Sequence, residues 1–139
     1  MRIMAIDLGD KRTGVAVSDI TGALAGEAFV IAQSDKKKLA GVIRAEAAKR
    51  GVSAIVVGKP VNMNGTEGER ALKSRAFAEL LAAETGLPIE LWDERRTTVD
   101  AARILHTAGK HGKKNRSRVD AVAAALILEG YLGLLNRDI

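Results

Sequence analysis

The stretch that decides the fold is residues 2–18, which read RIMAIDLGDKRTGVAVS. The run up to Asp7 is short, apolar and ends in an acid, which is typical of a strand buried on both faces. A break at residues 10–12 separates it from a second apolar run at 13–19, and residues 20–22 separate that run from a third at 23–32. We therefore expect three sequential antiparallel strands at the start of the chain.

Helical and strand patterns alternate after these strands. A helix over about 35–50, ended by Gly51, has Leu39, Val42 and Ile43 on one face, and a strand follows at 53–58. Thr66 and Glu69 form a T-x-x-E capping box for the next helix, which ends at Gly86. The inner face expected for that helix is Leu72, Ala76, Phe77, Leu80 and Leu81.

The last part of the chain adds one strand and two helices. The strand covers residues 88–94, and the helices cover 97–109 and the region from about Ser117 onward. The stripe expected on the last helix is Val119, Val122, Ala123, Leu126, Ile127, Gly130, Tyr131 and Leu134. The order predicts an α/β fold, with a mixed five-stranded sheet and helices on both faces.

Bulk composition limits the class of protein. A chain of 139 residues that is 47% hydrophobic fits one domain spanning residues 1–139. The absence of cysteine excludes disulfides, thiolate zinc sites and cysteine nucleophiles, and two histidines make a histidine-rich metal site improbable. The first apolar run meets Asp7 too early for a signal peptide or a membrane span, so we expect a cytoplasmic protein without a membrane partner.

The positive charge of the chain is concentrated in one segment. The net charge is +5, and residues 110–118 contain five basic side chains and no acid, so the rest of the chain is neutral. Such a cluster is typical of a surface that binds phosphate backbones, although a solvated basic loop is the alternative. The five side chains are Lys110, Lys113, Lys114, Arg116 and Arg118.

Acids at the ends of predicted strands and at a helix start could carry chemistry. Asp7 ends the first strand, where a buried carboxylate needs a partner or a cation, although it could instead cap the turn before Gly9. Asp93 and Glu94 end the fifth strand, and only one of them can face the same side as Asp7. Asp120 lies at the margin of an apolar stripe, and a capping box with Ser117 explains it equally well.

Three converging carboxylates would form an oxygen-only site of the kind that Mg²⁺ or Mn²⁺ prefers. Two such ions can activate a water and stabilise the leaving oxygen in phosphodiester cleavage. The chain has no Ser-His-Asp set, Walker A loop or G-x-G-x-x-G motif that would indicate another chemistry. The residues therefore favour a metal-dependent nuclease.

Four segments resemble the YqgF/RuvX family of nucleases: DLGDKRTGVAVSD (7–19), VVGKPVNMNGTEGER (56–70), WDERRTTVDA (92–101) and RVDAVAAALIL (118–128). The resemblance covers essentially the whole chain, and the chain differs in reading DERRTT where the family often has DERLST. It implies an RNase H-like fold and metal-binding catalytic acids at Asp7, Glu94 and Asp120, with Asp93 in reserve. It also implies that Gly58, Pro60 and Gly65 lie near the substrate, which a plain turn explains nearly as well.

The function implied by the resemblance is hydrolysis of phosphodiester bonds, with processing of the 5′ end of precursor 16S ribosomal RNA as the main expectation. The alternatives are a Holliday-junction resolvase and a non-catalytic nucleic-acid-binding module. The D-x-G of the first strand also resembles the phosphate loop of the actin and sugar-kinase group, but those proteins enclose a nucleotide between two such domains. We assign Arg12, Lys59 and Arg95 to nucleic-acid binding together with the basic segment, and expect a monomer or a homodimer.

Overall fold

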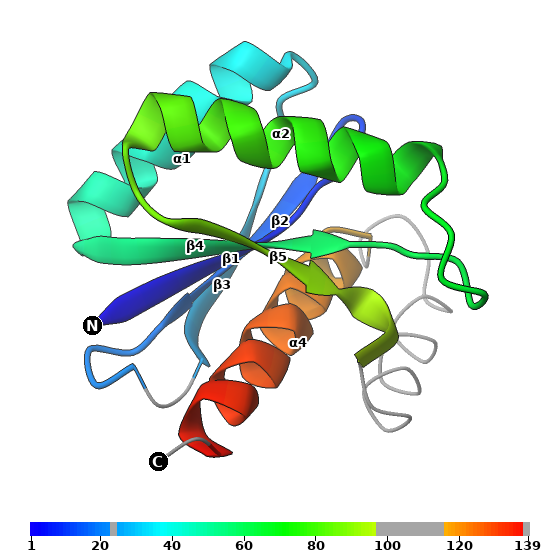
Figure 1. Ribbon diagram of the computed structural model, residues 1–139. Helices are drawn as coiled ribbons and strands as arrows, with labels where there is room; N and C mark the ends of the chain where they lie inside the picture. The colour runs from blue at the N-terminus through cyan, green and yellow to red at the C-terminus, as the bar shows by residue number, and fades with distance from the viewer. Residues whose placement is uncertain (23–24, 97–115, 138–139) are drawn as a thin grey trace.

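A computed structural model describes residues 1–22, 25–96 and 116–137, and its centre is one five-stranded sheet (Figure 1). The sheet has the strand order β3-β2-β1-β4-β5. Its antiparallel part is β1 (Arg2–Asp7), β2 (Thr13–Ser18) and β3 (Ala25–Ile31). β4 (Val52–Lys59) lies parallel to β1, and β5 (Ile89–Asp93) lies parallel to β4. The expected mixed sheet is therefore confirmed.

Helices cover both faces of this sheet, as the sequence predicted (Figure 1). α1 (Lys36–Arg50) and α2 (Glu69–Thr85) pack on one face around a core that includes Met4, Ile6 and Val57. α4 (Arg116–Arg137) packs on the other face, against Ala5 and Val56 among others. A short 3₁₀ turn, η1 (Glu94–Arg96), follows β5. Among the described residues, no helix is long and apolar enough to cross a membrane.

The ends of α1 follow the sequence closely, whereas the start of α2 does not. The Asp35 side chain accepts a hydrogen bond of 3.0 Å from the Lys38 backbone N–H, and Gly51 ends α1 in the left-handed conformation that glycine adopts without strain. The capping box predicted for α2 is wrong, because Gly68 is the N-cap residue and makes no side-chain bond. The Thr66 hydroxyl instead donates to Asn64 within the loop, at 2.7 Å.

Each of the first two helices exposes a residue that was predicted to face inward. Val42 on α1 is 37% exposed and Leu72 on α2 is 55% exposed, so both assignments to the inner face are wrong. α1 packs against α2 as well as the sheet, and small residues allow the close approach that such packing needs. The residues that α2 buries are Ala71, Ser74, Phe77, Ala78 and Leu81.

α4 also exposes a residue of its predicted stripe, and the face that it buries matters for the site. The buried residues of its described part are Ala124, Ile127, Leu128 and Leu132, while Leu134 of the predicted stripe is 38% exposed. Asp120 precedes Ala124 by four positions and Ile127 by seven, so it lies on the face that packs against the sheet rather than at its margin. Ser117 lies within the described part of α4 and is therefore not an N-cap residue. This position argues against the capping-box alternative for Asp120.

Several predictions concern residues that the structure does not describe. The helix expected at 97–109 and the cations Lys110, Lys113 and Lys114 lie outside the described residues. Arg116 and Arg118 belong to α4, but their side chains also lie outside the described part. The role of the basic segment therefore stays a prediction.

Candidate active site

Asp7 is the last residue of β1 and lies at the centre of the candidate site. Its cross-strand partner on β2 is Gly14, and the pairing of Ile6 with Val57 puts Gly58 of β4 on its other side. Asp7 is therefore flanked by a glycine on each neighbouring strand. The carboxyl ends of parallel strands are the usual binding edge of an open α/β sheet, and Asp7 stands at that edge.

The glycine on β2 brings Asp120 to the site. A Cβ atom added to Gly14 would lie 1.9 Å from the carbonyl oxygen of Asp120, which is an impossible contact. The first turns of α4 therefore lie directly on β2, and only glycine leaves room for them. Because Gly14 is also the partner of Asp7, this contact brings Asp120 close to Asp7. The sequence alone does not indicate this role of Gly14, because the role depends on the contact between β2 and α4.

The glycine on β4 brings Glu94 to the site in a similar way. A Cβ added to Gly58 would lie 3.3 Å from Glu94 Oε1 and 2.5 Å from Ile127 Cδ1. The 3₁₀ turn that begins at Glu94 therefore directs its carboxylate over β4, toward the end of β1. The proximity of Gly58 to the site agrees with what the family resemblance implied.

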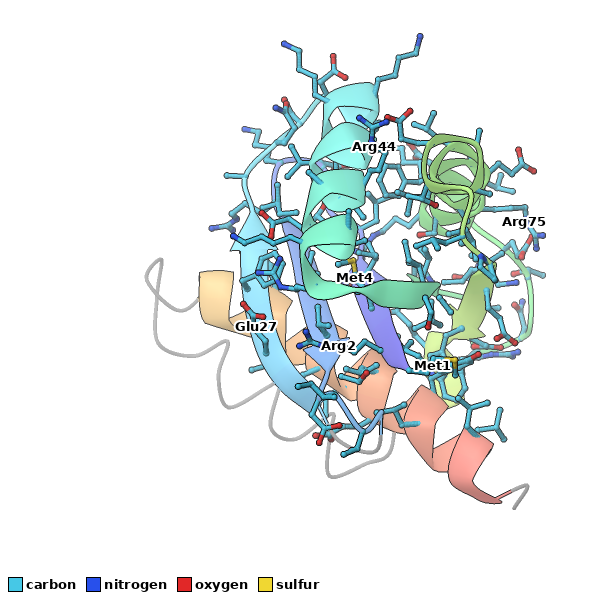
Figure 2. All side chains as sticks on the ribbon, turned by 90° about the vertical axis from the view of Figure 1, so that its left-hand side faces the viewer. Met1, Arg2, Met4, Glu27, Arg44 and Arg75 are labelled. Atoms are coloured by element: carbon cyan, nitrogen blue, oxygen red, sulfur yellow. The ribbon has the colours of Figure 1, made fainter. Side chains whose placement is uncertain are left out.

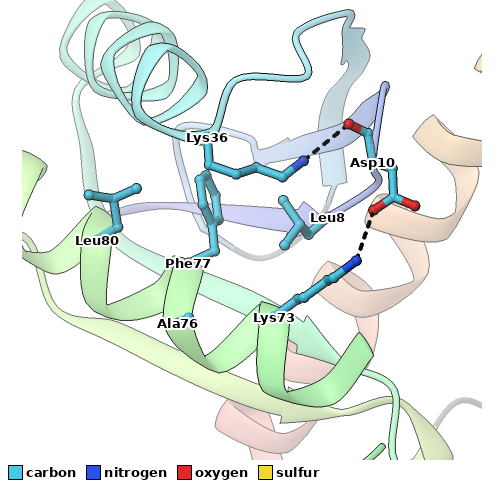
Figure 3. Close-up of a pocket in the computed structure, with 7 residues that line it drawn as sticks. All are labelled: Leu8, Asp10, Lys36, Lys73, Ala76, Phe77 and Leu80. Carbon is cyan, nitrogen blue, oxygen red and sulfur yellow. Dashed lines mark hydrogen bonds and ion pairs between the residues drawn. The ribbon is translucent and has the colours of Figure 1, made fainter. Parts of the chain in front are cut away.

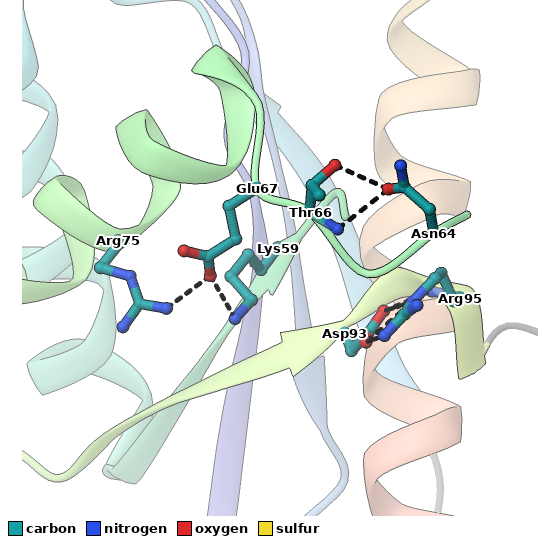
Figure 4. Close-up of polar contacts among 7 residues, drawn as sticks. All are labelled: Lys59, Asn64, Thr66, Glu67, Arg75, Asp93 and Arg95. Atoms are coloured by element: carbon teal, nitrogen blue, oxygen red, sulfur yellow. Dashed lines mark hydrogen bonds and ion pairs between the residues drawn. The ribbon is translucent and has the colours of Figure 1, made fainter. Parts of the chain in front are cut away.

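Asp93, the alternative to Glu94, is occupied elsewhere. Its carboxylate forms a bidentate ion pair with Arg95, with Nη2–Oδ2 at 2.6 Å and Nε–Oδ1 at 3.1 Å (Figure 4). This pair lowers the pKa of Asp93 below its usual value. Of the two acids at the end of β5, the geometry favours Glu94 as the partner of Asp7.

The three carboxylates share an environment that disfavours their charge. Burial, then the charges of Glu94 and Asp120, raises the pKa of Asp7 to about 7. Burial also raises the pKa of Glu94, with Asp93 adding to the effect and Arg70 opposing it. The pKa of Asp120 is raised by burial and lowered in part by Arg12. Three partly buried acids therefore face one another without enough positive charge to balance them.

The donor set fits a hard divalent cation. Only carboxylate oxygens are offered, which is the chemistry that Mg²⁺ and Mn²⁺ prefer, and a cation would reverse the unfavourable desolvation of these acids. As the side chains lie, no group of three or more His, Cys, Asp or Glu residues in the described part of the chain is close enough to share one ion.

Three of the cations that the sequence assigned to nucleic-acid binding have described side chains, and all three form ion pairs. Arg12 Nε lies 3.6 Å from Asp120 Oδ2, so Arg12 borders the site directly. Lys59 Nζ lies 2.7 Å from Glu67 Oε1, and Arg75 binds the same carboxylate (Figure 4). Arg95 is the partner of Asp93. Of the three, Arg12 is the one whose ion-pair partner is a candidate catalytic acid.

Arg70 is a functional candidate that the sequence analysis missed. It follows Glu69 in the first turn of α2, and its charge lowers the pKa of both Asp7 and Glu94. Its side chain is exposed and forms no ion pair with any described residue within 4 Å. A cation in the first turn opposes the helix dipole, and this unfavourable placement is the signal that could have identified it.

Solved structures share this architecture. The structure of RuvC from Thermus thermophilus superposes with a TM-score of 0.58 and 18% identity, covering 96% of each chain. The large terminase nuclease of the thermophilic phage G20c superposes with a TM-score of 0.57 and 12% identity, over 93% of this chain and 80% of that one. At such low identity these likenesses establish the fold alone, which is the RNase H-like resolvase fold.

Sequence comparison then defines the family. The model of the RuvX family, described as Holliday junction resolvase, matches residues 1–134. A relative from Halothermothrix orenii is 43% identical over 138 residues, covering 99% of this chain and 98% of the relative. One from Clostridioides difficile is 45% identical over 131 residues, covering 94% and 93%. Both are named "Putative pre-16S rRNA nuclease". The chain belongs to the RuvX (YqgF) family, as its motifs predicted.

Proposed function

We propose that residues 1–139 form a divalent-metal-dependent nuclease that hydrolyses phosphodiester bonds. One observation carries this proposal: acids from three separate elements converge on the end of β1. Asp7 ends β1, the Glu94 carboxylate lies beside Gly58 of β4, and the backbone of Asp120 lies against Gly14 of β2, and both acids act electrostatically on Asp7. Membership of the RuvX family supports the same reading.

In this proposal Asp7, Glu94 and Asp120 hold Mg²⁺ or Mn²⁺ and are the catalytic acids. A bound pair of such ions supplies a water activated for attack and a counter-charge for the leaving oxygen. The chain itself contributes the placement of the acids. Two glycines permit close approach, and the sheet and α4 keep the three acids at one edge, so that small side-chain movements would bring their carboxylates onto the ions.

For the substrate we propose the 5′ end of precursor 16S ribosomal RNA. The names of the relatives support this choice, and such a substrate implies activity in the cytoplasm. The chain has only four aromatic residues, and Trp92 and Phe77 are buried in the core. Base stacking is therefore unsuited as the main source of affinity for nucleic acid. Recognition then rests on phosphates and on the shape of the nucleic acid.

A Holliday junction is the alternative substrate. The description of the family model names this activity, and a solved RuvC structure that contains a Holliday junction superposes with a TM-score of 0.56 over 96% of this chain. Both substrates would be cut by the same acids, so the site alone does not distinguish them. The difference has to be measured on the two substrates directly.

The test is cleavage of a precursor 16S RNA fragment and a four-way DNA junction side by side, in Mg²⁺, Mn²⁺ or EDTA. We expect cleavage of the RNA at its mature 5′ end, dependent on metal and abolished by the chelator. Asp7→Asn is the control for a contaminating nuclease. Preferential cleavage of the junction would establish the alternative. Binding without cleavage under every condition would show a non-catalytic module, and full activity in EDTA would contradict the metal mechanism.

A further inference from the structure

A cleft opens beside the acidic site, between α1, α2 and the loop that follows β1 (Figure 3). It consists of two adjoining cavities that share four lining residues: Leu8, Asp10, Lys36 and Lys73. The apolar cavity, of about 270 Å³, is completed by Ala76, Phe77 and Leu80. The polar cavity, of about 110 Å³, is completed by Gly9, Arg70 and Ser74. Since Leu8 and Gly9 follow Asp7 directly, the cleft begins where the acidic site ends.

The polar part of the cleft carries excess positive charge. Lys36, Arg70 and Lys73 line it, and Asp10 is its one acid. Lys36 Nζ is held by backbone oxygens, donating to the carbonyls of Gly9 at 2.7 Å and Asp10 at 3.2 Å (Figure 3). Its charge is therefore fixed in place without being neutralised by a carboxylate in the described part of the chain.

The remaining contacts in the cleft are easily exchanged. Lys73 Nζ lies 3.6 Å from Asp10 and 3.3 Å from Glu69, and these two carboxylates are 84% and 83% exposed. Ion pairs this exposed contribute little to stability, so an incoming phosphate can replace them at small cost. Arg70 forms no ion pair with a described residue and is already available. The polar cavity thus presents three cations, Lys36, Arg70 and Lys73, to an incoming phosphate.

The apolar cavity suits a flat, weakly polar group. Leu8 and Leu80 are partly buried, and Phe77 closes its inner side (Figure 3). A nucleobase attached to a phosphate in the polar cavity would bring such a group to this surface. The small number of aromatic residues argues against stacking of many successive bases. It does not argue against a single apolar pocket that holds one base.

We infer that this cleft binds one nucleotide of the strand that is cut, adjacent to the scissile bond. Its phosphate lies among Lys36, Arg70 and Lys73, and its base lies on Leu8, Phe77 and Leu80. This inference rests on the proposed nuclease function and adds the direction in which the strand leaves Asp7, along α2 rather than along α4. Of the three cleft cations, Arg70 is the one whose charge also acts on Asp7 and Glu94, so it connects the two sites.

Binding of a short, fluorescein-labelled single-stranded RNA tests the phosphate half, with Ca²⁺ in place of Mg²⁺. We expect Lys36→Ala/Lys73→Ala to raise Kd at least about tenfold and to reduce the log-log salt slope by one to two. The matched control is Lys37→Ala/Lys49→Ala, which removes two exposed lysines of α1 outside the cleft and should change Kd less than about twofold. Equal effects of the two double variants would overturn the inference.

The single variant Lys73→Ala controls for loss of binding through misfolding. Lys36 also holds the loop after β1, whereas the ion pairs of Lys73 are with exposed carboxylates. It should keep the wild-type melting temperature and still weaken binding. If it binds the RNA as tightly as wild type, the phosphate subsite is refuted. Cleavage by the wild-type protein is measured separately. If the wild type cleaves while the lysine substitutions leave RNA binding unchanged, nucleotide binding in the cleft is refuted and the proposed nuclease function stands.

NMR titration with adenosine monophosphate and with inorganic phosphate tests the base half. The nucleotide should shift the methyl resonances of Leu8 and Leu80 together with the amide of Gly9. Inorganic phosphate should shift the Gly9 amide and leave the methyl groups unchanged. Identical shifts with the two probes, or none at the methyl groups, would show that the apolar cavity does not receive a base.

Discussion

The two ends of β1 use charge in opposite ways. At the start of the strand, Arg2 donates to the carbonyls of Ser18 at 3.0 Å and Arg50 at 3.1 Å, and the Ser18 hydroxyl accepts from the Ile3 N–H at 2.8 Å. At the other end, Asp7 faces two further acids. Four residues separate a cation held by two carbonyl oxygens from an acid that forms no ion pair with any residue in the described part of the chain.

The paired end forms a network that extends to neighbouring elements. Arg50, at the end of α1, binds Glu27 of β3 and Glu46, and its guanidinium lies 4.6 Å from the centre of the Phe29 ring. Arg2 and Glu27 of this network are labelled in Figure 2. These contacts lower the pKa of Glu27, whereas the pKa of Asp7 rises. The structural charges of Arg50 and Glu27 are therefore paired, whereas Asp7, the proposed metal ligand, has a perturbed pKa of the kind that is common at functional sites.

The largest effect should come from Asp7→Asn, which keeps the shape of the side chain and removes its charge. If Asp7 holds the metal, cleavage should fall by about 10³-fold or more, as expected when an essential metal ligand is lost. Binding to nucleic acid, measured in EDTA, should stay or tighten because a negative charge beside the phosphate has gone. Near-wild-type cleavage by this variant would mean that Asp7 only caps the turn before Gly9.

The same variant should be more stable than wild type at high pH. Because the folded-state pKa of Asp7 is raised to about 7, the wild type loses stability as pH rises from about 4 to 7, and the loss persists above 7. Without metal, the free energy of unfolding of Asp7→Asn should therefore exceed that of wild type by about 1–3 kcal/mol at pH 8. Below pH 4 the two proteins should be equally stable. Urea unfolding at the two pH values measures this, and a gain that is independent of pH would contradict it.

A smaller but still large effect should separate the two adjacent acids of the β5 end. Glu94→Gln removes the carboxylate near Gly58 and should reduce cleavage by about 10²-fold or more. Asp93→Asn breaks only the exposed pair with Arg95 and should cost less than about tenfold. Rates under single-turnover conditions give both values. The reverse order would make Asp93 the ligand.

An intermediate effect should come from Gly14→Ala. The new Cβ would collide with the Asp120 carbonyl, displacing the start of α4 and costing about 1–3 kcal/mol of stability with a clear loss of cleavage. Gly41→Ala is the control, since a Cβ there meets nothing within 4 Å and should stabilise α1 by about 0.5–1 kcal/mol. Thermal unfolding and cleavage are measured on both. If Gly14→Ala cleaves normally, α4 does not position Asp120.

The smallest effect on cleavage should come from the paired end of β1. Arg50→Ala breaks two ion pairs and the contact with Phe29, so it should cost about 1–2 kcal/mol of stability and leave the cleavage rate unchanged. Arg44→Ala removes only an exposed pair with Glu84 and should cost less than about 0.5 kcal/mol. A loss of cleavage in Arg50→Ala at a temperature where it is folded would show that the two ends communicate.

Most of the sheet could be predicted because strand patterns are local. The apolar runs and the breaks at residues 10–12 and 20–22 specify three strands, and Asp35 and Gly51 specify α1 through contacts within a few residues. The inner faces of α2 and α4 could not be predicted as reliably. A helix turns by about 100° per residue, so a rotation of one position exchanges Leu72 for Ala71, and packing against distant elements decides it.

The candidate site shows the same division. Asp7 and the acid pair at Asp93–Glu94 follow from their places at strand ends, but the choice of Glu94 depends on the 3₁₀ turn and on the ion pair made by Asp93. The partnership of Gly14 with Asp120 spans more than one hundred residues of sequence and leaves no local pattern. The unfavourable position of Arg70 at a helix start is visible in the sequence, but its effect on Asp7 and Glu94 depends on how α2 packs against the sheet.

The docking of α4 on β2 also decides when the protein can become active. Asp7, Glu94 and Asp120 are distributed along the chain, and the third acid reaches Asp7 only after α4 has folded onto Gly14. During synthesis, a nascent chain that already has its first four strands still lacks two of the three carboxylates. In the proposed mechanism the folding of α4 is therefore the activation step, and fragments that end before α4 should fail to cleave nucleic acid.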